Sequence, residues 1–99
     1  MVISTELKDI IKNPKTTLID LRNQDELDEV GFLPQAKHIP MPELAEHLQQ
    51  IQQMPGAVVL FCKSGGRAGR AKTFLQQHGV EQVYNAGGYH DVAQVLEEK

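Results

Sequence analysis

The sequence predicts an α/β fold of three layers, α/β/α, in which a mainly parallel central sheet lies between helices. Segments with strand character and segments with helical apolar periodicity alternate along the chain, an order typical of parallel sheets. The stretch 57–61 (AVVLF) is apolar throughout, as expected of a strand buried on both faces. A length of 99 residues is enough for one core, and we expect residues 1–99 to form a single domain.

The first half of the chain carries two helical and two strand segments before residue 40. Ser4 or Thr5 can cap a first helix, which ends at Asn13-Pro14 because proline disfavours helical backbone in the residue before it. The elements predicted after this helix are a strand at 17–21, a short charged helix at 24–30 and a brief strand at 36–39.

The second half repeats this alternation around the central strand. A helix is predicted to begin at Met41-Pro42, since Leu44, Leu48 and Ile51 fall on one helical stripe. The elements predicted after the central strand are a helix at 67–78 capped by Gly79, a strand at 80–84, a turn at 85–88 and a helix at 89–98.

Cys62, the only cysteine, directly follows the central strand. The small residues Ser64, Gly65 and Gly66 come next, and glycines can adopt positive φ angles that let several backbone N–H groups converge on one point. The helix predicted from Arg67 presents its N-terminus there, and a helix N-terminus favours an anion in front of it. In this sequence the anion would be the thiolate of Cys62.

A buried structural cysteine is the alternative interpretation, since free cysteines are among the most buried residues. The location of Cys62 between a strand and a loop instead indicates an exposed sulfur. Three cationic side chains, Lys63, Arg67 and Arg70, follow within eight residues and can stabilise a thiolate. We therefore favour a reactive thiolate and expect its sulfur to be exposed.

Several polar residues are interpreted as structural support. Asp20 falls in a strand that is otherwise suited to burial, so it needs hydrogen-bond partners, and loop N–H groups are favoured over a catalytic role. Arg22 and Glu26 are four residues apart, a spacing that allows an ion pair. His38 is expected to be hydrogen-bonded rather than to act as an acid or base.

Four motifs, taken together, resemble the rhodanese family of sulfurtransferases. The segment 62–67 (CKSGGR) is similar to that family's active-site loop, with cysteine first, glycine fourth and arginine sixth. The segments 17–22 (TLIDLR), 31–40 (GFLPQAKHIP) and 87–89 (GGY) resemble three further family motifs in the same order. Ala68 is a departure, because many active members carry serine there.

The resemblance implies a sulfurtransferase that moves a sulfane sulfur through a persulfide on Cys62, with no metal or organic cofactor. It implies a small anionic donor such as thiosulfate and a thiophilic acceptor, namely cyanide in vitro and a thiol or a protein in the cell. Cys62 and Arg67 would be catalytic. The residues implied to bind substrate are Lys63, Ser64, Gly65, Gly66, Arg67 and Ala68.

Two other classes remain open. Cysteine-dependent phosphatases and arsenate reductases have a similar loop, C-x5-R, whereas the interval here is C-x4-R, which fits a sulfur atom better than a tetrahedral oxyanion. A non-catalytic rhodanese-homology module that binds a protein is the other class. Such relatives often lose the cysteine, which this chain keeps.

The composition limits the classes of molecule that this protein is expected to bind. A net charge of −3 argues against nucleic acid, while the basic segment 63–70 suits a small anionic substrate. One cysteine cannot form an intramolecular disulfide, and the four histidines lack zinc-ligand spacing with it, so no metal site is expected. No apolar run approaches the ~18 residues of a membrane span, and the N-terminus does not resemble a signal peptide, so we expect a cytoplasmic protein without membrane association.

Overall fold

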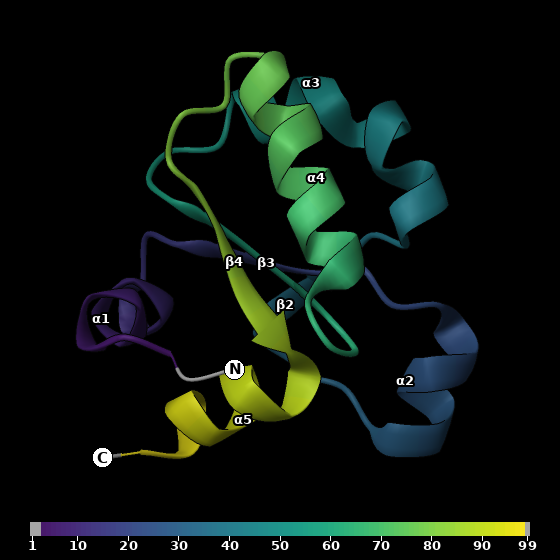
Figure 1. Ribbon diagram of the computed structural model, residues 1–99, viewed down its shortest axis with the longest axis vertical. Coiled ribbons are helices and arrows are strands. Elements are labelled where there is room, and N and C mark those ends of the chain that lie inside the picture. Colours follow the sequence, from purple (N-terminus) through teal and green to yellow (C-terminus); the bar gives the residue numbers. More distant parts are fainter. Residues whose placement is uncertain (1–2, 99) are drawn as a thin grey trace.

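The computed structural model describes residues 3–98, which form a four-stranded parallel sheet with helices on both faces (Figure 1). The strands, in the spatial order β2-β1-β3-β4, are β1 (Thr17–Asp20), β2 (Ala36–His38), β3 (Val58–Cys62) and β4 (Val83–Gly88). The helices are α1 (Thr5–Lys12), α2 (Gln24–Val30), the 3-10 helix η1 (Met41–His47), α3 (Leu48–Gln52), α4 (Gly66–Gln77) and α5 (Tyr89–Glu97). The predicted three-layer α/β fold is confirmed.

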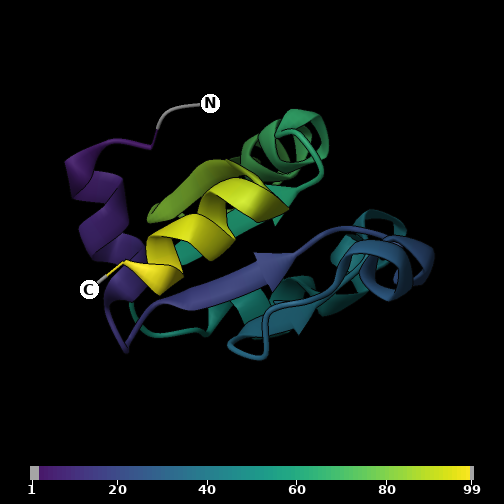
Figure 2. The same ribbon diagram turned by 90° about the horizontal axis from the view of Figure 1, so that it is seen from below.

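The central strand β3 supplies both halves of the hydrophobic core. Val58, Leu60 and Cys62 face the layer formed by η1, α3 and α4, whereas Val59 and Phe61 face the layer of α1 and α5. All five residues of β3 are buried. The uninterrupted apolar run predicted this burial for Val58 to Phe61, but not for Cys62. Helices α1 and α5 contact one another and lie side by side in both views (Figures 1 and 2).

The first helix begins where the sequence predicted. The backbone N–H of Leu7 donates to the Ser4 side-chain oxygen at 3.2 Å, which satisfies one of the free N–H groups of the first turn.

The parallel strands place their carboxyl ends at one edge of the sheet. Strands β1, β3 and β4 therefore end there together, at Asp20, Cys62 and Gly88. Ligand sites in such sheets lie beyond this edge.

The prediction for the last strand was wrong. Residues 85–88, predicted as a turn, belong to β4, which begins at Val83 instead of Val80. Pairing with β3 explains the difference: the register runs from Val58–Val83 to Cys62–Gly88, with an irregularity between Leu60 and Cys62. A β-carbon at Gly88 would collide with the backbone oxygen of Lys63. Gly88, one of the glycines that suggested a turn, therefore permits a close approach to the residue that follows β3.

The single helix predicted from Met41 is also wrong, because the structure divides it into η1 and α3. In a 3-10 helix, residues three apart share one face. Met41 and Leu44 have that spacing. Leu44 is buried and the partly buried Met41 packs against the same cluster, so the tighter winding turns both side chains towards the core. Leu48 and Ile51 then continue the apolar contact from α3.

Candidate active site

The cysteine loop, residues 62–67, connects β3 to α4 at the carboxyl edge of the sheet. Gly65 has φ +103°, a left-handed conformation that favours glycine, and α4 begins at Gly66. This turn directs the backbone N–H of Gly65 back to the Sγ atom of Cys62, at 3.1 Å. The loop therefore encloses the sulfur with its own backbone.

The expectation of an exposed sulfur is wrong, since only 1% of Cys62 is accessible to solvent. Cys62 shares one face of β3 with Val58 and Leu60, so its side chain points towards the layer that contains α4. The fully buried Ala68, in the first turns of α4, belongs to the same cluster. Helix α4 consequently covers the Cys62 thiol on this face of the sheet. At the carboxyl edge of the sheet, the thiol is surrounded by the cysteine loop.

Two opposing effects act on the pKa of Cys62. Burial, the largest single influence, raises the pKa of the thiol. Hydrogen bonds from the backbone N–H groups of Ala68, Ser64, Gly65 and Arg67 favour the thiolate, and together they hold the pKa below its ordinary value. The thiolate is thus stabilised mainly by amides of the cysteine loop and α4. Lys63 and Arg70, which were predicted from the sequence to stabilise the thiolate, have exposed side chains.

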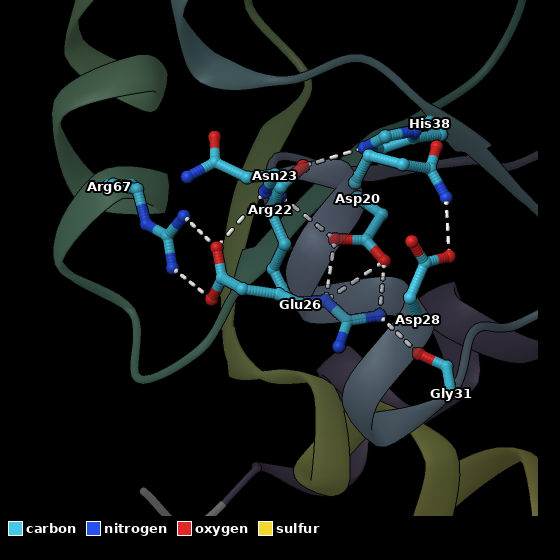
Figure 3. A network of polar contacts seen from close by, with 9 residues as sticks. Asp20, Arg22, Asn23, Glu26, Asp28, Gly31, His38 and Arg67 are labelled. Atoms are coloured by element: carbon cyan, nitrogen blue, oxygen red, sulfur yellow. Dashed lines mark hydrogen bonds and ion pairs between the residues drawn. The ribbon is translucent and has the colours of Figure 1, made fainter.

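Arg67 is bound to Glu26 of α2. Its two terminal nitrogens, Nη1 and Nη2, donate to the two carboxylate oxygens at 2.6 and 2.8 Å (Figure 3). Chiefly because of Arg67, the pKa of Glu26 falls to about 2, and the same bonds raise the pKa of Arg67, to which Cys62 also contributes. The expected Arg22–Glu26 ion pair is therefore wrong: Glu26 binds the arginine of the cysteine loop.

Arg22 instead pairs with Asp20, and both side chains are almost fully buried. The guanidinium donates through Nε and Nη2 to the Asp20 carboxylate at distances down to 2.7 Å, and Nη2 also donates to the Gly31 backbone oxygen at 2.8 Å. Asp20 further accepts from the backbone N–H of Arg22, in the loop that follows β1, at 3.0 Å. His38 Nε2 lies 2.6 Å from the Arg22 backbone oxygen (Figure 3).

Asn85 is a supporting residue that the sequence analysis missed. Its amide nitrogen Nδ2 donates to the Gly65 backbone oxygen at 3.0 Å, and its Oδ1 accepts from the Gly87 N–H at 2.8 Å. A β-carbon on Gly65 would lie 3.3 Å from the Gly87 Cα, so the loop packs closely on β4. Asn85 was assigned to a turn, and only the register of β3 with β4 brings it to the loop.

The family comparison agrees with this geometry. Residues 4–94 match the family model described as the rhodanese-like domain. This chain belongs to that family. A rhodanese-like domain thus accounts for nearly all the residues that the structure describes, from the first helix to α5.

Individual relatives support the same assignment. A crystal structure of a Staphylococcus saprophyticus protein is 31% identical, covers 93% of both chains and superposes with a TM-score of 0.72. An E. coli rhodanese solved with anions is 28% identical, with coverage of 79% and 92% and a TM-score of 0.65. A tRNA uridine(34) hydroxylase of Hamiltonella defensa subsp. Acyrthosiphon pisum is 32% identical over 88 residues, 84% of this chain. The present chain spans only 24% of that relative's length.

Within this rhodanese-like domain the predicted site residues differ in which of their atoms lie near the Cys62 sulfur. The backbone of the cysteine loop surrounds the sulfur, while the side chains of Lys63 and Ser64 are exposed. Among residues 3–98, no group of three or more His, Cys, Asp or Glu side chains could hold a metal ion. In the same range no helix is both long and apolar enough to cross a membrane. The loop thus presents a cysteine sulfur whose pKa is lowered by the backbone N–H groups around it.

Proposed function

We propose that this rhodanese-like domain is a sulfurtransferase that carries sulfane sulfur as a persulfide on Cys62. The donor is thiosulfate or a related small anion, and the acceptor is cyanide in vitro and a thiol or protein thiol in the cell. One observation carries the proposal: the loop N–H groups converge on the Cys62 sulfur and lower its pKa despite its burial. A thiol of that kind is a nucleophile and not merely core packing.

The first half-reaction charges the enzyme. The Cys62 thiolate attacks the outer sulfur of thiosulfate, the sulfur–sulfur bond of the donor breaks, and sulfite leaves with the bonding electron pair. The backbone N–H groups of Ser64, Gly65 and Ala68 face the Cys62 sulfur and stabilise the thiolate that begins the attack. Lys63, the second residue of the loop, is exposed and attracts the anion electrostatically.

Arg67 contributes to this reaction mainly through its charge. Both of its terminal nitrogens are bonded to Glu26, so the fork is not open to clamp a donor in the way that an unpaired arginine would be. Its cationic charge still favours the thiolate: Glu26 is the main cause of the raised pKa of Arg67, and Cys62 adds to that rise. Glu26 therefore acts as a positioning residue for Arg67.

The second half-reaction returns the enzyme to its starting state. A nucleophilic acceptor attacks the outer sulfur of the persulfide, the sulfur–sulfur bond breaks, and Cys62 leaves as a thiolate. Cyanide becomes thiocyanate, and a thiol becomes a persulfide. The lowered pKa of Cys62 assists this step because a stabilised thiolate is a better leaving group.

The relatives are consistent with an anionic donor. The E. coli rhodanese with which this chain shares 28% identity was solved with anions. The relationship to the tRNA hydroxylases covers about a quarter of the Hamiltonella protein, so we do not extend hydroxylation of tRNA to this chain. The C-x4-R interval favours sulfur transfer over phosphate chemistry, and the retained cysteine favours catalysis over a binding-only module.

Mass spectrometry of the intact protein tests the proposal. Incubation with thiosulfate should add the mass of one sulfur atom, and subsequent cyanide should remove it with release of one equivalent of thiocyanate. The variant Cys62→Ser, which keeps the size and hydrogen-bonding capacity of the side chain, should show neither change. An unchanged mass in the native protein under these conditions contradicts the proposal.

A further inference from the structure

The segment 87–89, where β4 continues directly into α5, packs against the cysteine loop (Figure 1). Gly88 is buried and is the partner of Cys62 in the register of β3 with β4. A β-carbon built on Gly88 would collide with the backbone oxygen of Lys63. The φ angle of Gly88 is −106°, which any residue can adopt, so the lack of space and not the backbone conformation requires glycine here.

The Lys63 oxygen belongs to the same peptide unit as the N–H of Ser64. A trans peptide unit is planar, and its C=O and N–H groups point in opposite directions. The oxygen of this unit points to Gly88, and its N–H is one of the four backbone donors to the Cys62 sulfur. A displacement of the oxygen would therefore rotate the unit and turn the Ser64 N–H away from the sulfur. The contact with Gly88 determines the direction of this donor.

Asp91, in the first turn of α5, holds Gly88 in this position. Its Oδ2 atom accepts a hydrogen bond from the Gly88 N–H at 2.9 Å, in the manner of a carboxylate that reaches back to the cap of its own helix. The same oxygen lies 3.2 Å from the position of a Gly88 β-carbon. Asp91 forms no ion pair among residues 3–98, so the Gly88 N–H is the partner that its carboxylate has there.

We propose that Asp91 is a positioning residue for sulfur transfer, which holds Gly88 against the Lys63–Ser64 peptide unit and thereby directs the Ser64 N–H to the reacting sulfur; the inference rests on the proposed sulfurtransferase function. Asp91 acts through Gly88 and not on the sulfur itself. Its negative charge works against this role, because a nearby carboxylate disfavours a thiolate. The hydrogen bond and the charge of Asp91 therefore have opposite effects on the pKa of Cys62, and variants can separate them.

The pH dependence of Cys62 alkylation by iodoacetamide tests the inference on the full-length protein. Asp91→Ala removes both the hydrogen bond and the charge, and its alkylation midpoint should rise by about 0.5–1 pH unit, as expected when one of several hydrogen bonds to a thiolate is weakened. Asp91→Asn keeps an oxygen that accepts from the Gly88 N–H but has no charge, so its midpoint should be at or slightly below the native one. The charge of Arg67, which also favours the thiolate, is the same in all variants.

Two outcomes of this experiment would overturn the inference. If Asp91 acted through its charge alone, both variants would lower the midpoint, because a negative charge is lost in each. An unchanged midpoint in Asp91→Ala would show that the Ser64 N–H does not depend on this hydrogen bond.

Ser4→Ala is the control for a purely structural role. It removes the cap of α1 and should lower the stability of the protein without changing the alkylation midpoint. A rise in the midpoint of Ser4→Ala equal to that of Asp91→Ala would mean that lost stability causes the shift, and the inference would fail.

A matched pair of glycine variants tests the contact itself. Gly88→Ala introduces the β-carbon that collides with the Lys63 oxygen, and it should raise the midpoint more than Asp91→Ala does. Gly69→Ala makes the same change in α4, where the new β-carbon has an ordinary contact at 3.5 Å, and it should leave the midpoint unchanged. The Asp91 variants decide the question should Gly88→Ala not fold.

Sulfur loading separates this inference from the proposed function. At pH 7, Asp91→Ala should load sulfur from thiosulfate several-fold more slowly than Asp91→Asn, and the difference should shrink as the pH rises and the Cys62 thiol ionises. If the native protein is not loaded but the midpoints differ as expected, the sulfurtransferase proposal fails and the effect of Asp91 on the thiol stands. If the native protein is loaded and Asp91→Ala loads and alkylates as it does, the positioning role fails alone.

Discussion

Two arginines lie near the cysteine loop, and their ion pairs differ in burial and in reach. Arg22 pairs with Asp20 two residues away, and both side chains are at most 3% exposed. Arg67 pairs with Glu26 at a separation of 41 residues, and both side chains are 24% exposed. The first pair maintains the end of β1, whereas the second connects α2 to the start of α4.

The difference separates stability from catalysis. A buried ion pair that loses one partner leaves an uncompensated charge in a medium of low dielectric, so its removal mostly destabilises the fold. A partly exposed pair is screened by water and contributes less to the free energy of unfolding. Because Arg67 is also the arginine beside the thiolate, removal of Glu26 should affect sulfur transfer more than stability.

The largest effect is expected from Arg22→Met. The variant leaves Asp20 buried without its partner and should lower the free energy of unfolding by about 3–5 kcal/mol, measured by urea denaturation. The double variant Asp20→Asn with Arg22→Met removes both charges and should recover part of this loss. A loss below about 1 kcal/mol in the single variant, the range of surface pairs, would show that the buried pair is no more important than Glu26–Arg67.

A smaller effect is expected from Glu26→Gln. The substitution should cost about 1–2 kcal/mol in free energy of unfolding at neutral pH, since the pair is charge-assisted but partly screened. The pKa of Glu26 is lowered from 4.5 to about 2, so its contribution is present above pH 4.5 and disappears as the pH falls towards 2.

The pH dependence of stability distinguishes the contribution of Glu26 from acid denaturation of the whole protein. The stability difference between native protein and Glu26→Gln should be constant above about pH 5 and should shrink below it. The variant should also load sulfur from thiosulfate more slowly, because Arg67 loses its orientation. A difference that is independent of pH down to 2 would contradict the assignment of the low pKa to Glu26.

The sequence predicted the fold well where one local pattern decided the structure. The uninterrupted apolar run of β3 and the cap at Ser4 are both present where expected. Most of the errors share a physical cause: they concern partners that lie far apart in the chain. The spacing of Arg22 and Glu26 suggested a local pair, but the fold places Arg67 nearer to Glu26.

The candidate site shows the same limit. The composition of the cysteine loop predicted converging N–H groups, and the structure places Gly65 accordingly. The burial of Cys62 was not predictable from its location at the end of a strand, because it depends on which face of β3 the helix α4 covers. Asn85 gave no signal at all, since its role arises from the register of two strands.

Asn85 provides the smallest and most specific test of the comparison, because it supports the cysteine loop without any charge. Asn85→Asp keeps an oxygen that can accept from the Gly87 N–H but loses the donor to the Gly65 oxygen. The Gly65 N–H should then be less well directed at Cys62, and the new carboxylate adds a negative charge nearby. Both effects should raise the pKa of the thiol.

The pH dependence of alkylation by iodoacetamide measures this pKa directly. Its midpoint should move to higher pH in Asn85→Asp, with a several-fold slower reaction at pH 7 and a loss of stability of only about 1 kcal/mol. Asn85→Ala serves as the control, since it removes both hydrogen bonds without adding charge and should give a smaller shift in the same direction. An unchanged alkylation midpoint in both variants would mean that α4 alone fixes the N–H groups around Cys62. Of the contacts made by side chains, only the ion pair between Arg67 and Glu26 would then hold the cysteine loop in place.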